Sequence, residues 1–177
     1  FPYIPVKTNL YHFISPLMGE RAIDVEFQGS FTSPGVGWQR NTASTMLSKR
    51  SDLRVPSMEK RGSYKAYFRE LTQSKCTLGL FSFGEICYRD FEAFIAGSVL
   101  IKPDMSHMRT WPDWYIKDET YISVAWDLSD LEQKIDQVIG DWIHYRQVAA
   151  AAQKRYQYFV GPAGKKEFAC RFVDIVT

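Results

Sequence analysis

The chain has 177 residues, of which 45% are hydrophobic and 24% are charged, so its composition is that of a folded domain and excludes a disordered segment. Its 22 Lys and Arg against 20 Asp and Glu leave a formal charge of +2. This near balance does not favour a nucleic-acid-binding protein, which usually carries a clustered basic surplus. We also predict no transmembrane segment, because no run approaches the roughly 18 apolar residues of a membrane span.

The cysteines and the first residues of the chain indicate its cellular compartment and whether it is part of a longer protein. Cys76, Cys87 and Cys170 are irregularly spaced without a C-x-x-C pair, which indicates neither a zinc site nor a disulfide framework. We therefore expect a cytoplasmic protein, with a peripheral position at the membrane as the alternative. The chain opens with Phe1 and shows no signal-peptide pattern, so we interpret it as a fragment of a longer protein.

The chain divides into a lead-in segment, residues 1–20, and one domain, residues 21–177. The lead-in carries three prolines and no sustained periodicity. The expected elements of the domain are, in order, a strand over 22–28, a helix over 38–49, a strand over 53–56, a helix over 63–74 capped by Ser63, a strand over 76–82, a helix over 88–96 ended by Gly97, strands over 98–102 and 120–126, a helix that follows a Ser129 cap and bends or breaks at Gly140, and helices over 143–159 and 165–176.

The order of these elements predicts an α/β fold. The runs over 76–82 (CTLGLFS) and 98–102 (SVLIK) are apolar throughout, as is typical of parallel strands that are buried on both faces. In total, five expected strands interleaved with helices predict a Rossmann-like parallel sheet flanked by helices.

Two loops are candidates for a ligand site, because ligands of open parallel sheets bind at the carboxyl ends of the strands. The first, residues 29–37 (GSFTSPGVG), starts with Gly29 and Ser30 and has glycines and hydroxyls that suit a phosphate. The second is Phe83-Gly84-Glu85. An ordinary β-α turn is the alternative interpretation of each loop.

The second loop leads into a charged helix face. Glu85, Arg89 and Glu92 follow each other at i, i+4 and i+7, so we expect all three side chains on one face near the helix start. An arginine there suits a diphosphate, and an acidic residue suits ribose hydroxyls. The alternative is a salt-bridge ladder on the surface of the helix.

Three further basic residues are candidates for ligand contact. Arg40 follows the glycine-rich loop, Lys75 immediately precedes a buried strand, and Lys102 ends the strand over 98–102. Each of them either contacts a phosphate or is merely exposed.

Histidines and tryptophans give weaker indications. No two histidines are spaced at i, i+4, so we predict no metal site. His107 either approaches an acceptor or packs in its loop. Trp111, Trp114 and Trp126 either stack on a sugar or base or belong to the core.

The stretch FSFGEICYRDFEAFIAGSVLIKPDMSHMRTWPDWY, followed by ETYISVAWDLSDLEQKI, resembles the carboxy-terminal half of GT-B glycosyltransferases. The similarity is to group-1-like and exostosin-like members with an R-D-F/Y-E-A-x-x-x-G core. It covers about residues 74–158, and RAIDVEFQGSF looks like the first strand and glycine turn of the same half-domain.

The resemblance implies a domain that binds a nucleotide-diphosphate sugar without metal or other cofactor. It implies Arg89 on the diphosphate, Glu92 on the ribose, and Gly84 and Glu85 near the sugar or phosphate. Phosphates would lie near the glycine turn at Gly29. The sequence departs from the E-x7-E pair of many such enzymes, because the first position falls on Gly84.

Two functions of different classes follow. In the first, the chain is the donor domain of a glycosyltransferase that transfers the sugar to an acceptor glycan or glycolipid, together with an amino-terminal acceptor domain in the same or another chain. In the second, it is a non-catalytic module that binds a nucleotide or a sugar phosphate. A flavodoxin-like or other α/β domain with a purely structural charged helix ranks after both.

Overall fold

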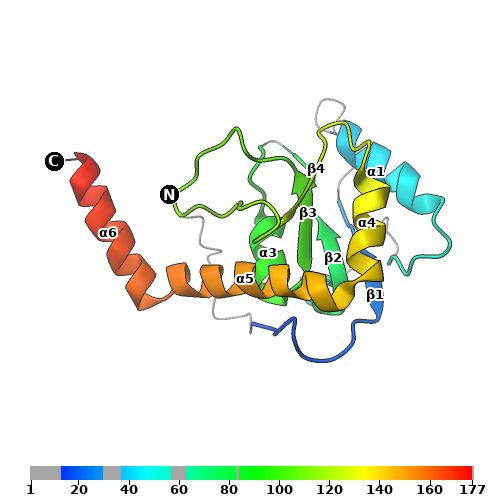
Figure 1. Cartoon of the computed structure of the whole chain (residues 1–177), viewed down its shortest axis with the longest axis horizontal. Coiled ribbons are helices and arrows are strands. Elements are labelled where there is room, and N and C mark those ends of the chain that lie inside the picture. Colours follow the sequence, from blue (N-terminus) through cyan, green and yellow to red (C-terminus); the bar gives the residue numbers. More distant parts are fainter. Residues whose placement is uncertain (1–12, 30–36, 57–62, 83, 177) are drawn as a thin grey trace.

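The structure, a computed structural model, describes residues 13–29, 37–56, 63–82 and 84–176. A parallel sheet lies between two layers of helices (Figure 1), which confirms the predicted α/β class. The described strands are β1 (Ile23–Glu26), β2 (Ser74–Leu78), β3 (Val99–Pro103) and β4 (Ile122–Val124). The described helices are α1 (Trp38–Ser48), α2 (Tyr64–Thr72), α3 (Tyr88–Ala96), α4 (Leu131–Gly140), α5 (Trp142–Val160) and α6 (Pro162–Val176).

Each strand pairs with its neighbour in sequence. The order is β1-β2-β3-β4, and every pair is parallel. Val25 is level with Cys76, which is level with Val99, so one row of side chains crosses three strands. All four carboxyl ends therefore lie at one edge of the sheet, and all four amino ends lie at the other.

Helices cover both faces of the sheet. Ala43 and Leu47 of α1 and Leu131 and Ile135 of α4 pack with one face. On the other face lie α3, Phe68 of α2, and the segment 104–121. The long helix α5 passes beneath the amino ends of the strands and contributes to both cores (Figure 1).

The second face of the sheet carries a buried polar layer. Glu26, Thr77 and Lys102 alternate with apolar residues along β1, β2 and β3, and none of the three is exposed to solvent. The runs over 76–82 and 98–102 were expected to be apolar throughout, and that expectation is wrong for this face, where Thr77 and Lys102 lie. The polar layer lies toward the carboxyl ends of the strands, where the candidate site begins.

Several boundaries differ from the expected ones. Residues 53–56 form no strand; instead the Arg54 carbonyl accepts a hydrogen bond from the Asp24 N–H at 2.9 Å beside β1. The helix after β4 has Asp130 rather than Ser129 at its N-cap. The helix over Tyr88–Ala96 is confirmed, as is the Ser63 cap, whose hydroxyl accepts from the Ala66 N–H at 3.3 Å.

Gly97 ends α3 as predicted. Its φ of 67° is left-handed, a conformation that glycine adopts without a Cβ penalty. A Cβ at this position would also collide with the carbonyl oxygen of Ile14. The end of α3 and the segment before β1 can therefore pack closely only around a glycine.

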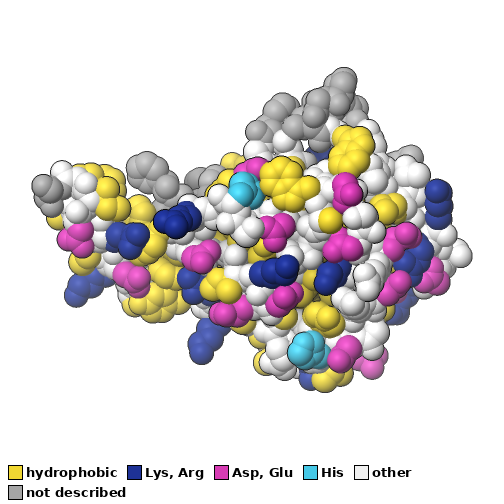
Figure 2. Space-filling model, turned by 45° about the horizontal axis from the view of Figure 1, so that its top comes forward, with side chains coloured by type: hydrophobic (Ala, Val, Ile, Leu, Met, Phe, Trp, Pro, Cys, Tyr) yellow, Lys and Arg dark blue, Asp and Glu magenta, His cyan; other side chains and the backbone are white. Residues whose placement is uncertain are grey.

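α6 extends away from the body of the molecule (Figure 1). It is attached through α5 and through Trp111, whose ring stacks on Phe168 at a centroid distance of 5.6 Å. Phe172 and Ile175 are 48% and 72% exposed, and hydrophobic side chains are visible on this projecting end in Figure 2. In the described part of the chain, no helix combines the length and apolar character that crossing a bilayer requires.

Candidate functional site

A crevice is expected where the loops after two neighbouring parallel strands lead to opposite faces of the sheet. The segment after β1 leads to α1, which packs on one face, whereas the loop after β2 leads to α3 on the other. The carboxyl ends of β1 and β2 thus lie between the first turns of two helices. Gly29, at the start of the first sequence-predicted loop, follows β1, and Gly84 and Glu85 of the second follow β2; residues 30–36 and Phe83 lie outside the described residues.

Arg40 reaches this place from the first turn of α1. A Cβ built on Gly29 would lie 3.4 Å from Arg40 Nη1, so the guanidinium lies directly against the backbone at Gly29. Ser30, the other predicted donor-binding residue of this loop, lies outside the described residues.

Arg89 reaches the same place from the first turn of α3. Its Nη2 donates to the carbonyl oxygen of Gln28 and its Nη1 to that of Leu78 at 3.4 Å, so the guanidinium joins the ends of β1 and β2. Burial lowers the pKa of Arg40, and the positive charge of Arg89 lowers it further. Arg40 lies against the backbone at Gly29 and Arg89 donates to the carbonyl oxygen of Gln28, so the two guanidiniums lie against consecutive residues at one edge of the sheet.

A buried carboxylate, that of Glu26, lies near the Arg89 guanidinium and carries the opposite charge when ionised. Glu26 is fully buried, and its Oε2 accepts a hydrogen bond from the Thr77 hydroxyl at 2.6 Å. Burial raises the pKa of Glu26, and the nearby charge of Arg89 opposes that rise. Its Oε1 has no hydrogen-bond partner among the residues that the structure describes.

Glu92 faces α2. Its two carboxylate oxygens accept hydrogen bonds from the hydroxyls of Tyr64 at 2.7 Å and Tyr67 at 2.8 Å. A carboxylate has about four lone-pair sites, so these bonds leave acceptor capacity for another donor. Contact of Glu92 with a ribose stays a prediction.

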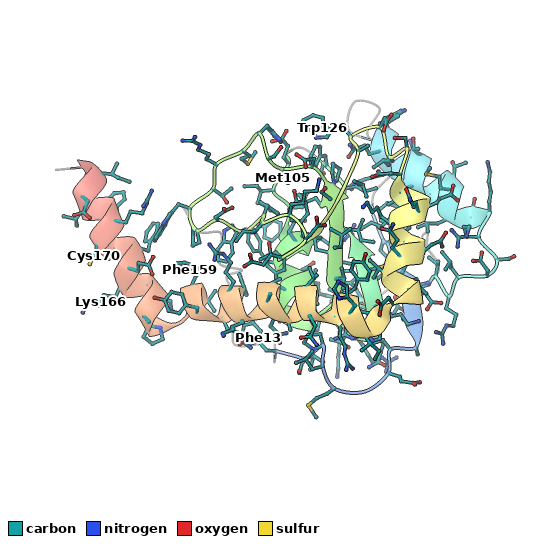
Figure 3. All side chains as sticks on the ribbon, in the orientation of Figure 1. Phe13, Met105, Trp126, Phe159, Lys166 and Cys170 are labelled. Carbon is teal, nitrogen blue, oxygen red and sulfur yellow. The ribbon has the colours of Figure 1, made fainter. Side chains whose placement is uncertain are left out.

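Glu85 is not on the helix as expected. α3 begins at Tyr88, so Glu85 belongs to the loop that follows Gly84, and only Arg89 and Glu92 share a helix face. Its Oε2 lies 3.0 Å from His107 Nε2, and the His107 ring lies 5.1 Å from that of Trp126. Trp126 is 49% exposed at the carboxyl edge of the sheet (Figure 3), so an acidic side chain, an imidazole and an indole lie together there.

Lys102 was expected to point into the crevice, but its side chain is buried under the loop at Glu85. Its ammonium group donates to the carbonyl oxygens of Gly79 at 3.0 Å and Glu85 at 2.5 Å and lies 3.1 Å from Asp90 Oδ2. An ammonium has three donors, and this environment offers an acceptor for each. Because Lys102 is also fully buried, we assign it to supporting the loop at Glu85 rather than to contacting a ligand.

Lys75 lies at the wrong end of the sheet for this site. It is the second residue of β2, near the amino ends, and its Nζ donates to Asp24 Oδ1 at 2.8 Å.

The tryptophans of the loop 104–121 do not lie at this site. Trp114 is 4% exposed and belongs to the core, which was one of its two predicted roles. Trp111 packs against α6.

Sequence reasoning missed Glu26, Tyr67 and Gln28, which surround Arg89. A signal was present in residues 22–28, where Asp24, Glu26 and Gln28 alternate with apolar residues and so predict one polar face. Tyr67 had no comparable signal, because its contact depends on how α2 docks beside α3.

Among the residues that the structure describes, no group of three or more His, Cys, Asp or Glu side chains is arranged to hold a metal ion.

In comparisons with known proteins, no family model matches the chain, and no curated protein matches it. Among solved structures, it is similar to the C-terminal domain of a glycosyl transferase group 1 family protein (LpcC) from Francisella tularensis. The identity is 14% and the TM-score 0.44, over 69% of this chain and 62% of that one. One fold of this kind serves many functions, so the chemistry must be argued from the site itself.

Proposed function

We propose that this chain binds the diphosphate of a nucleotide sugar between Arg40 and Arg89 and acts as the donor domain of a glycosyltransferase. The observation that carries the proposal is the position of two guanidiniums at the carboxyl ends of β1 and β2, with Arg40 against Gly29 and Arg89 on the carbonyl oxygens of Gln28 and Leu78. Like charges at close range destabilise each other, and an anion between them removes that repulsion. The resemblance around R-D-F-E-A supports the same ligand.

The chemistry of transfer gives these arginines a role. When a sugar leaves a nucleotide diphosphate, negative charge develops on the departing phosphate and must be stabilised. Paired guanidiniums can supply this stabilisation without a metal ion, through bidentate hydrogen bonds to phosphate oxygens. Arg40 and Arg89 fill that role in the proposal.

The neighbouring groups suit the rest of the donor. The carboxylate of Glu85, beside His107, offers an acceptor for sugar hydroxyls, and the half-exposed ring of Trp126 offers an apolar surface for a sugar face. Glu92 is the candidate for ribose. The acceptor glycan or glycolipid, and the base that deprotonates it, would come with an amino-terminal domain.

Calorimetric titration with UDP, GDP, ADP and CMP, each with and without magnesium, tests the proposal. We expect saturable, magnesium-independent binding of one nucleotide. Arg40→Gln should weaken it about tenfold or more, the scale of one hydrogen bond between charged groups. Arg40 is the better first target because Arg89 also holds the ends of two strands, so Arg89→Lys is the second variant.

The control is Lys154→Gln, which removes one positive charge from an exposed position on α5 and should leave nucleotide affinity unchanged. Glu92→Gln should weaken binding of the nucleoside diphosphate more than binding of pyrophosphate. A folded protein that binds none of the four nucleotides contradicts the proposal, as does equal weakening by Arg40→Gln and Lys154→Gln.

A further inference from the structure

A second basic site lies at the amino edge of the sheet, away from the crevice. A cavity of about 420 Å³ opens there between the starts of β1 and β2 and the first turn of α5. Four of its described lining residues are cationic, namely Arg21, Arg54, Lys75 and Arg146, whereas one, Glu20, is acidic. This volume is in the range of small-molecule sites.

Part of this charge is balanced from within the fold. Asp24 accepts from Lys75 Nζ at 2.8 Å, and from Arg54 Nε and Nη2 at 3.1 Å each. Counting Asp24 and Glu20 against the four cations leaves an excess of two positive charges around the cavity. A dianion would match that excess.

Arg21 adds a buried charge at the same place. It is 4% exposed, and its guanidinium donates to the carbonyl oxygens of Ser74 and Ala96, at 2.9 Å each, rather than to a carboxylate. The guanidinium also lies 5.8 Å from the ring centroid of Trp142. Burial lowers the pKa of Arg21 to about 10, so the group is still charged at neutral pH.

Two residues that line the cavity each carry a hydrogen-bond donor with no acceptor among the described residues. The donors are the indole Nε1 of Trp142 and Nε of Arg146, and both atoms are buried. A buried donor without an acceptor costs about 1–3 kcal/mol, so both would gain from an acceptor within the cavity. The two residues are four positions apart on α5, so their side chains lie on one face of the helix, beside the cavity.

From this combination we propose that the cavity binds the phosphate group of a phosphate monoester. Phosphate is a dianion near neutral pH and has several oxygens that accept from guanidinium and indole N–H groups together. The side chains supply these donors, because Asp141 Oδ1 already accepts from the His144 N–H at the start of α5. The site is separate from the proposed nucleotide site and does not depend on it.

The phosphate has two possible sources, a soluble metabolite or a lipid headgroup. The cavity is larger than a bare phosphate ion, so it can hold part of a small organic ester. Ile143 lines the cavity and is 63% exposed, and Met18, next to the lining residue Gly19, is 78% exposed. Apolar side chains beside a cationic cavity also suit an anionic membrane surface.

The test uses the whole chain labelled with nitrogen-15. The indole N–H signal of Trp142, assigned by its loss in Trp142→Phe, is followed during titration with inorganic phosphate and glycerol 3-phosphate, with chloride at matched ionic strength as reference. Sedimentation with phosphatidylcholine vesicles, with and without phosphatidic acid, forms the second arm. Both arms are repeated with Arg146→Gln and with Lys154→Gln, which removes one positive charge from an exposed position on the same helix.

We expect a saturable shift of the Trp142 signal with the phosphates, weakened about tenfold or more by Arg146→Gln and unchanged by Lys154→Gln. If the soluble phosphates bind with this dependence on Arg146, the ligand is a soluble metabolite. If only vesicles that contain phosphatidic acid bind with this dependence, the ligand is a lipid headgroup. Absence of binding in both arms overturns the proposal. Equal loss in the two variants, or an equal shift with chloride, also overturns it, because binding would then reflect general charge.

Discussion

Replacing Lys102 by Met should destabilise the protein strongly. Lys102 and Asp90 are both fully buried, with Nζ 3.1 Å from Oδ2. The substitution keeps the approximate volume of the side chain but leaves the Asp90 carboxylate with the Tyr115 hydroxyl at 2.6 Å and the Cys87 N–H at 3.1 Å as its remaining donors. The carbonyl oxygens of Gly79 and Glu85 also lose a donor.

Breaking a buried pair by removing one partner costs about 3–5 kcal/mol, because an uncompensated charge remains. For a chain of this size, that corresponds to a fall in Tm of roughly 6–20 °C. Urea unfolding followed by tryptophan fluorescence gives the free energy, and thermal unfolding gives Tm. Lys154→Met, which changes an exposed lysine of α5, should stay within about 0.5 kcal/mol of the parent.

A double-mutant cycle separates the charge from the packing. Adding Asp90→Asn to Lys102→Met removes the stranded charge while keeping an acceptor for Tyr115, so the double variant should recover about 1 kcal/mol or more relative to additivity. A loss below about 1 kcal/mol in Lys102→Met, or strict additivity in the cycle, would refute the view that this pair is a coupled buried unit.

Three further outcomes are expected. Burial alone would raise the pKa of Asp24, but hydrogen bonds from Arg54 and Lys75 outweigh it and lower the pKa to about 2. The resulting stability is present above the unfolded pKa near 4 and is lost as pH falls toward 2, so Asp24→Asn should flatten the dependence of the urea midpoint on pH in that window; an unchanged slope would contradict this. The thiol of Cys170 is exposed on α6 (Figure 3), whereas burial raises the pKa of Cys76, so a thiol reagent should modify Cys170 first and spare Cys76 until the protein unfolds; peptide mapping that finds Cys76 modified in the native state would show otherwise. A Cβ on Gly79 would lie 2.6 Å from Asp90 Oδ1 and from Leu100 Cδ1, so Gly79→Ala should cost about 1–3 kcal/mol in urea unfolding, whereas Gly140→Ala, with open space around it, should cost nothing; similar values for both would rule out crowding at Gly79.

Periodic patterns predicted the elements well and the side-chain network poorly. The helix over Tyr88–Ala96 follows from its apolar spacing and from Gly97, both of which are local. The position of Glu85 could not be predicted from local spacing, because Lys102, 17 residues further along the chain, donates a hydrogen bond to its carbonyl oxygen and so holds the loop before that helix. Residues 53–56 show the same limit, since a short segment with strand-forming residues can lie beside a strand without joining the sheet.

The two candidate sites differ in how far they could be predicted from the sequence. Arg40 was singled out because it follows the glycine-rich loop and Arg89 because it lies on a charged helix face after the second loop, and the structure brings both to one edge of the sheet. The amino-edge cavity was not foreseen, because its residues come from four separate segments whose meeting depends on how α5 crosses under the sheet. Lys75 was predicted as a candidate for phosphate contact at the carboxyl edge, but it lines the amino-edge cavity instead.

The consecutive order of the strands has a consequence for how the chain folds. Each new strand can add to the exposed edge of the one just completed, so the sheet can grow in the direction of synthesis without waiting for distant segments. α5 enters late: its Gln153 side chain donates to the carbonyl oxygens of Phe94 and Ile95 at 3.0 Å and of Ile14 at 2.9 Å. Closure of the domain, and with it the amino-edge cavity, therefore depends on the last third of the polypeptide.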